Sequence, residues 1–177
     1  MSDGPPRAEV TVRRAREADL DAMVELFAAV ADEGRWIAAE PPVDREQRRR
    51  RFAEDLGGDQ VVSLVAEAGG ELVGLLNLYL AGYGVADLGM LVADGWRRRG
   101  VGSALLRAGI DRARQAGAHK VALQVWPHNQ AAIALYERFG FQHEGRLRRH
   151  YRRRSGELWD AVVMGRLLDE GRTKPTP

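Results

Sequence analysis

The sequence predicts a single α/β domain with a mixed, largely antiparallel sheet and helices on both of its faces. Strand-like and helix-like segments alternate along 177 residues, a length typical of one domain. Neighbouring strand-like segments are also joined by tight glycine turns, which a purely parallel, doubly wound sheet does not contain. Because 45% of the residues are hydrophobic, the chain can bury a sizeable core.

The first half of the domain is expected to contain two helices and four strands. Alternating side chains predict the strands, apolar residues three and four apart predict the helices, and Gly69–Gly70 predicts a hairpin turn. A loop with two prolines and Trp36 separates the helices. The expected segments are a strand at 10–15, helices at 16–34 and 44–58, a hairpin at 60–80 and a strand at 85–93.

The second half is expected to alternate helix and strand before it ends in a long hairpin that turns at Ser155–Gly156. Its segments are a helix to about Gly117, a strand at 119–126, a helix at 129–140 and a hairpin at 141–168. The whole order is strand, helix, helix, three strands, helix, strand, helix, two strands. We expect one domain over 9–168, with a flexible N-terminus at 1–8 and a flexible tail at 169–177.

Composition excludes several classes of protein. The chain has no cysteine, so disulfides and thiolate metal sites are excluded. No stretch approaches the ~18 apolar residues that span a membrane, and the start has no apolar signal segment, so we expect a soluble, cytoplasmic protein. Residues 1–96 carry 10 basic and 18 acidic side chains, whereas residues 97–177 carry 17 basic and 7 acidic. This asymmetry indicates either an anionic ligand for the second half or simply a surface rich in arginine.

The segment Arg97–Gly102, "RRRGVG", which we call the phosphate loop, precedes the longest predicted helix. A helix N-terminus offers unpaired N–H groups to phosphates, glycines permit close approach, and arginines add charged hydrogen bonds. The loop lacks the Lys-Ser/Thr ending of a nucleotide-hydrolysing P-loop and the third glycine of a dinucleotide fingerprint. On its own it indicates an anion site, or an ordinary glycine loop with surface arginines.

A second motif makes the indication specific. The chain resembles the GCN5-related N-acetyltransferase (GNAT) superfamily over residues 10–168, closest to its phosphinothricin and amino-acid acetyltransferase branch, with "DLGMLV" before the loop and "GFQHEG" onward after it. The resemblance implies the GNAT, or acyl-CoA N-acyltransferase, fold. It rests on the phosphate loop and on a run with Asn129, Ala132, Leu135, Tyr136, Gly140 and Phe141.

The resemblance implies that acetyl-CoA is the co-substrate. His128 and His150 have no ligand partner at metal spacing, so we expect no metal site. The pyrophosphate would lie on the phosphate loop, and the pantetheine arm would pair with the preceding strand. Asn129 would bind the pantetheine, although it suits a plain helix N-cap equally well. The implied cofactor-binding residues are Met90, Leu91, Val92, Arg97, Arg98, Arg99, Gly100, Val101, Gly102, Ser103, Asn129 and Tyr136.

Two residues are candidates for the chemistry. Tyr136 would be the general acid that protonates the departing CoA sulfur, although its helical stripe with Leu135 and Phe139 also fits a core residue. Asp87 matches a strand carboxylate that serves as base in phosphinothricin-type members, where glutamate is usual. The shorter side chain suggests a proton relay through water, and the alternative is a charge that faces solvent.

The loop that follows Glu33 corresponds to one wall of the acceptor pocket in this superfamily. We expect Arg35 to pair with a substrate carboxylate, Trp36 to cap a small apolar group, and Glu33 to contact the substrate. Glu33 and Glu40 are weaker candidates, for either the base or a substrate contact. Surface packing is the alternative for all of them.

The sequence therefore predicts an acyl-CoA-dependent N-acetyltransferase that acts on the primary amine of a small, amino-acid-like substrate by direct attack in a ternary complex. The alternatives are a protein N-terminal or lysine acetyltransferase and a non-catalytic acyl-CoA-binding domain. The basic run at 146–154 makes nucleic-acid binding a further alternative, but no recognition motif accompanies it. We expect no nucleic-acid or membrane partner, and relatives suggest a homodimer.

Overall fold

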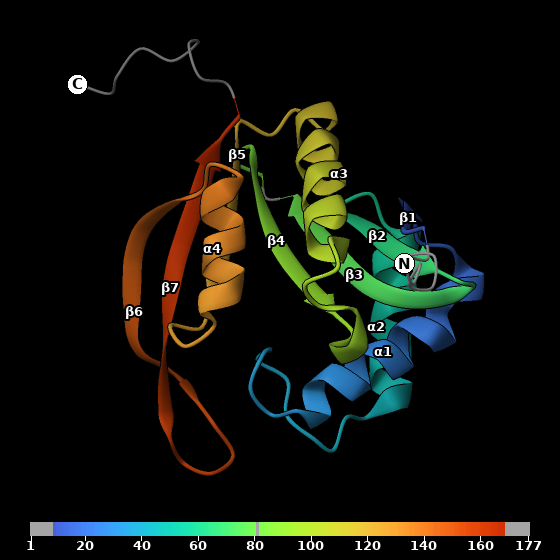
Figure 1. The fold of residues 1–177 in the computed structure, drawn as a ribbon, viewed down its shortest axis with the longest axis horizontal. Helices are drawn as coiled ribbons and strands as arrows, with labels where there is room; N and C mark the ends of the chain where they lie inside the picture. Colours follow the sequence, from blue (N-terminus) through green and yellow to red (C-terminus); the bar gives the residue numbers. More distant parts are fainter. Residues whose placement is uncertain (1–8, 81, 169–177) are drawn as a thin grey trace, which may run out of the picture.

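A computed structural model describes residues 9–80 and 82–168 and contains the predicted elements in the predicted order (Figure 1). Two short 3-10 helices, Glu17–Asp19 and Asp94–Trp96, are additional. Residues 1–8 and 169–177, expected to be flexible, lie outside the described residues. The elements are β1 (Thr11–Arg14), α1 (Leu20–Asp32), α2 (Arg45–Gly57), β2 (Val61–Ala68), β3 (Glu71–Leu80), β4 (Val85–Val92), α3 (Val101–Gln115), β5 (Lys120–Val125), α4 (Gln130–Arg138), β6 (Gln142–Arg152) and β7 (Leu158–Leu167).

Within the part of the chain that the structure describes, seven strands form one sheet in the order β1-β2-β3-β4-β5-β7-β6, and the sheet opens at its centre. Its one parallel pair is β4 with β5, which pair only from Val85–Asp87 to Lys120–Ala122. Beyond Asp87, β4 keeps β3 as its partner, while β5 continues along β7. The two central strands therefore diverge and leave a split between them.

Helices cover both faces, as predicted, and each face has its own apolar core. Figure 1 shows α3 and α4 on one side of the sheet, on either side of β4. Their face buries Leu76, Leu105 and Val121, whereas α1 and α2 bury Phe52 and Val65 on the other. Because successive residues of a strand point to opposite faces, each face of β4 is set by alternation. Asp87, Gly89 and Leu91 therefore share the face of α1 and α2.

The edge strand β6 is long and mostly exposed, and it pairs with β7. Leu147 and Tyr151 pair with Ala161 and Trp159, two residues apart on β7, so both lie on one face. Part of the basic run at 146–154 is engaged within the protein. Arg146 contacts Asp160 at 2.7 Å, and Arg153 is only 4% exposed.

Candidate active site

A cavity of about 680 Å³ occupies the split between β4 and β5. One end lies beside the phosphate loop, α3 and α4, and the other lies against the loop between α1 and α2 and the β6–β7 hairpin. The lining residues from the predicted set are Trp36, Met90, Leu91, Val92, Arg97, Arg98, Gly100, Gly102, Ser103, Asn129 and Tyr136. The predicted residues Glu33, Arg35, Asp87, Arg99 and Val101 do not line it.

The phosphate loop presents bare backbone at the start of α3. Gly100 is the N-cap of α3 with φ of +89°, a conformation that side chains other than glycine rarely adopt. A Cβ at Gly102 would lie 3.0 Å from Leu135, so glycine allows α3 to approach α4 closely. The first N–H groups of α3 therefore face the cavity without a side chain in front of them, which suits a phosphate.

The three arginines of the phosphate loop have different surroundings. Arg97 lines the cavity, but its guanidinium binds both oxygens of Glu33 at 2.5 and 2.7 Å. Arg98 is exposed and lines the cavity, and no ion pair is found for it in the described ranges. Arg99 lies over the Trp96 ring, 5.3 Å from its centroid, outside the cavity. Arg98 is therefore the arginine best placed to meet a phosphate.

Tyr136 lies on α4, buried at 6% exposure, with its ring centroid 5.7 Å from that of Phe141. It also lines the cavity, so its ring belongs to the core while part of it reaches the site. Burial raises the pKa of Tyr136 to about 12. Within the described residues its hydroxyl has no hydrogen-bond partner. The phenol is therefore protonated at neutral pH and available as a donor.

The remaining cofactor candidates lie along the same cavity. Met90, Leu91 and Val92 line it from β4, whose side toward β5 has no strand partner there. A ligand can therefore hydrogen-bond to this strand edge. Asn129 is the N-cap of α4, and its side-chain oxygen accepts the Ala132 N–H at 3.2 Å. It caps the helix and lines the cavity at once, so the two sequence interpretations are compatible.

Asp87 is exposed and lies beside the site rather than in it. It shares a sheet face with Gly89 and is two residues before it, and Gly89 lines the cavity. Tyr79 is its partner on β3, and Ala122 is its partner on β5. Asp87 does not line the cavity itself, so the proton relay through water stays a prediction.

Of the three residues predicted to bind the acceptor, one lines the cavity and the other two contact that residue from outside it. Trp36 lines the cavity, and its indole N–H donates to Glu33 at 2.6 Å. Glu33 therefore joins Trp36 to Arg97, and this hydrogen bond from Arg97 lowers the pKa of Glu33 despite burial. Arg35 is exposed, with its guanidinium 4.2 Å from the Trp36 ring centroid. Glu33 and Arg35 thus position Trp36, and the cavity does not include them.

Sequence reasoning missed most of the surface at this end of the cavity, which we call the acceptor wall. It consists of Trp36, Ile37, Ala38, Trp126 and Tyr151. The Trp126 and Tyr151 rings meet edge to face at 4.9 Å, and Tyr151 donates its hydroxyl to Gln124 at 2.8 Å. No motif signals this group, because its members come from three segments that only the folded chain brings together.

The described ranges contain neither a cluster of metal ligands nor a helix suited to a membrane. Across residues 9–80 and 82–168, no three histidine, aspartate or glutamate side chains group as metal ligands. In the same ranges, none of the helices has both the length and the apolar character needed to cross a bilayer.

Comparison with known proteins identifies the class. The profile of the Acetyltransferase (GNAT) family matches residues 20–141. The L-amino acid N-acetyltransferase AaaT of Escherichia coli (strain K12) is 30% identical over 165 residues, 90% of this chain and 99% of AaaT. The L-methionine sulfoximine/L-methionine sulfone acetyltransferase of Pseudomonas paraeruginosa is 27% identical over 93% of this chain and 98% of its own.

A solved structure agrees with these relatives. The GNAT superfamily phosphinothricin acetyltransferase of Sinorhizobium meliloti, solved in complex with acetyl-CoA, matches with a TM-score of 0.81 and 25% identity. The match covers 94% of this chain and 93% of that one. The chain therefore belongs to the GNAT family of acetyltransferases. It is an acyl-CoA-dependent N-acetyltransferase with acetyl-CoA as its co-substrate, and the split cavity and bare phosphate loop fit that molecule.

Proposed function

We propose that this enzyme acetylates the amine of a small, amino-acid-like acceptor, with Tyr136 as general acid and Asp87 as a base that acts through water. The main support for this proposal is that one continuous cavity reaches the phosphate loop, Tyr136 and the acceptor wall. Both substrates can therefore be bound together, as direct transfer requires.

The phosphate loop and α3 would bind the pyrophosphate of acetyl-CoA, with Arg98 adding charge. The strand edge at Met90–Val92 and Asn129 would hold the pantetheine arm, and so direct the thioester toward Tyr136. These roles follow from the bare N–H groups of the loop and from the unpaired side of β4.

The reaction then needs one new bond and two proton movements. The acceptor nitrogen attacks the thioester carbonyl, and the carbon–sulfur bond breaks as the tetrahedral intermediate collapses. The proton lost by nitrogen passes through water to Asp87, and the departing sulfur takes a hydrogen bond and proton from Tyr136. Ser103 lines the cavity but has no hydrogen bond to a basic side chain in the described ranges, so no acyl-enzyme is proposed.

The choice of a small acceptor rests on relatives and on the shape of the site. AaaT and the methionine sulfoximine enzyme are named for amino acids or their analogues. An α-amino group, with a pKa of about 8, is partly neutral at pH 7 and needs a weaker base than a lysine amine. The loop between α1 and α2 also contacts the β6–β7 hairpin over the acceptor end, which disfavours an open peptide groove.

A thiol-release assay tests the proposal. It would pair acetyl-CoA with free amino acids, phosphinothricin-like analogues, polyamines and short peptides, with calorimetry for CoA binding alone. Selective turnover of one amino acid or analogue supports the proposal. Turnover of peptides alone would assign a protein acceptor instead, and CoA binding without any turnover would indicate a non-catalytic role.

We also propose that the enzyme works in the cytoplasm and as a homodimer. The absence of cysteine agrees with a compartment where disulfides are not used, and the dimer follows the resemblance. Cell fractionation and light scattering of the purified protein test these two proposals.

A further inference from the structure

Arg153 is a buried charge that the proposed mechanism does not use. It lies at the tip of the β6–β7 hairpin and is 4% exposed, whereas arginine is rarely buried without dedicated partners. It does not line the cavity. Its backbone N–H donates to Glu157 at 2.8 Å, and the Gly156 N–H donates back to its carbonyl at 2.9 Å, so the tip is a closed turn.

The partners of Arg153 come from a loop more than a hundred residues away. Its guanidinium donates to the carbonyl oxygens of Ala38 at 3.1 Å and Gly34 at 3.2 Å, and its Nε lies 3.3 Å from the Glu40 carboxylate. The guanidinium also lies 4.3 Å from the ring centroid of Trp159. The planar fork of arginine satisfies several acceptors at once, which lysine cannot do.

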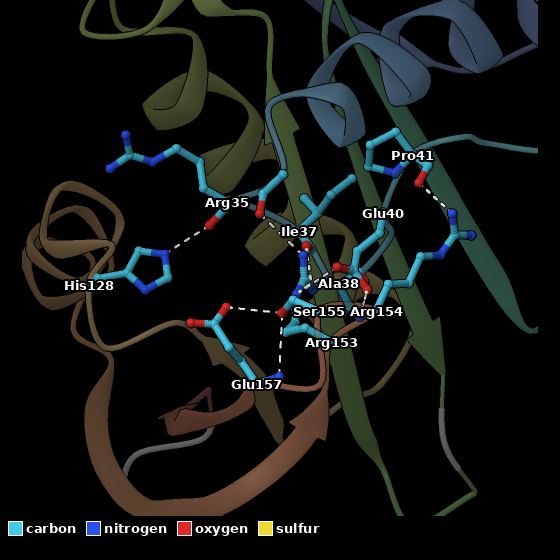
Figure 2. Close-up of polar contacts among 11 residues, drawn as sticks. Arg35, Ile37, Ala38, Glu40, Pro41, His128, Arg153, Arg154, Ser155 and Glu157 are labelled. Carbon is cyan, nitrogen blue, oxygen red and sulfur yellow. Dashed lines mark hydrogen bonds and ion pairs between the residues drawn. The ribbon is translucent and has the colours of Figure 1, made fainter.

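Other contacts hold the same loop. Residues 34–43 form no helix or strand, so their carbonyls need partners from elsewhere. The Arg154 N–H donates to Glu40 at 2.9 Å, and its side chain donates to the Pro41 carbonyl. His128 Nε2 donates to the Arg35 carbonyl at 2.8 Å. Figure 2 shows these side chains converging on the loop from the hairpin tip and from the segment before α4.

We propose that Arg153 is a positioning residue that sets acceptor selectivity by holding residues 34–40 against the cavity. The carbonyl it holds at Ala38 belongs to the part of the acceptor wall formed by Trp36, Ile37 and Ala38. The backbone position of that part decides how much room faces Trp126 and Tyr151. The inference rests on the proposed function, since it concerns the same acceptor.

The experiment compares Arg153→Lys with Arg152→Lys, the same change at the exposed neighbour. Steady-state kinetics use two amino-acid acceptors of different side-chain size, calorimetry gives acetyl-CoA affinity, and hydrogen exchange follows residues 34–40. We expect faster exchange there, KM for the preferred acceptor raised about tenfold with kcat nearly unchanged, and a smaller preference between the acceptors. Acetyl-CoA affinity should stay within about twofold, because the polar contacts of the Arg153 side chain go to the loop at 34–40 and to none of the predicted cofactor-binding residues.

Each outcome bears on the proposal. Unchanged exchange and acceptor preference in Arg153→Lys overturn it, and so does an equal effect of Arg152→Lys. If Arg153→Lys does not fold, Glu40→Gln weakens the contact with Arg153 from the side of the loop. Hydrogen exchange and acceptor preference in Glu40→Gln then test the proposal in the same way. If the wild-type enzyme acetylates no amino acid but does acetylate peptides, the proposed acceptor is wrong. Hydrogen exchange at residues 34–40 and the preference among peptides then still test the positioning role of Arg153.

Discussion

Replacement of Tyr136 by phenylalanine removes one hydroxyl and keeps the ring that packs against Phe141. Because no described residue hydrogen-bonds that hydroxyl, the free energy of unfolding should change by less than about 1 kcal/mol. The effect should fall on the reaction. A hydrogen bond to a charged acceptor contributes about 1.5–3 kcal/mol, and full proton transfer about 10²–10⁴-fold in rate.

We therefore expect kcat to fall about 100-fold in Tyr136→Phe, with acetyl-CoA affinity unchanged. Thiol release at saturating acceptor measures kcat, and calorimetry measures the affinity. Since the pKa of Tyr136 is raised to about 12, the phenol stays protonated, and wild-type kcat should not decline on the alkaline side up to about pH 10.

The variant also defines the refutation. If Tyr136→Phe retains more than about half of the wild-type kcat, the hydroxyl is not the general acid and Tyr136 is a core residue alone. If kcat and acetyl-CoA affinity fall together, the change has disturbed the cavity instead. The pH profile of the wild-type enzyme is a separate test that needs no variant. A fall of wild-type kcat in alkaline solution well below pH 12 would contradict a buried, protonated phenol.

Three further predictions concern cofactor, base and stability. Arg98→Gln should weaken acetyl-CoA binding about tenfold at low salt and less at high salt, whereas Arg99→Gln, outside the cavity, should have a smaller effect; calorimetry at two salt concentrations compares them. Asp87→Asn should lower kcat/KM most near pH 7, and kcat/KM should return toward the wild-type value at higher pH, where the acceptor amine loses its proton without a base. If the ratio of variant to wild-type kcat/KM does not change with pH, Asp87 is not on the proton path. The Arg13 guanidinium lowers the pKa of Asp19, so this pair stabilises the fold above pH 3.8 and the gain is lost in more acidic solution. The Tm of Asp19→Asn should therefore be lower than that of the wild type at pH 7, and the two Tm values should converge in acid.

The local patterns of the sequence predicted the helices and strands, and the resemblance implied the fold. Strand alternation, helical periodicity and glycine turns are properties of neighbouring residues, and they predicted the order and approximate bounds of every α-helix and strand from β1 to β7, though not the two 3-10 helices. The phosphate loop was also a local feature, because its glycines and the helix that follows are contiguous. The resemblance then supplied Tyr136 and Asn129, both of which line the cavity.

Tertiary structure alone decided what each candidate contacts. Arg97 appeared equivalent to Arg98 in the sequence, but folding brings Glu33 to it across 64 residues, and the ion pair occupies its guanidinium. Arg153 belongs to the basic run at 146–154, where nothing local distinguishes it from its neighbours, yet it is buried against carbonyls 115 and 119 residues away. Local periodicity carries no information about such contacts, because they depend on where β4 and β5 separate and on which loop and hairpin meet over the split.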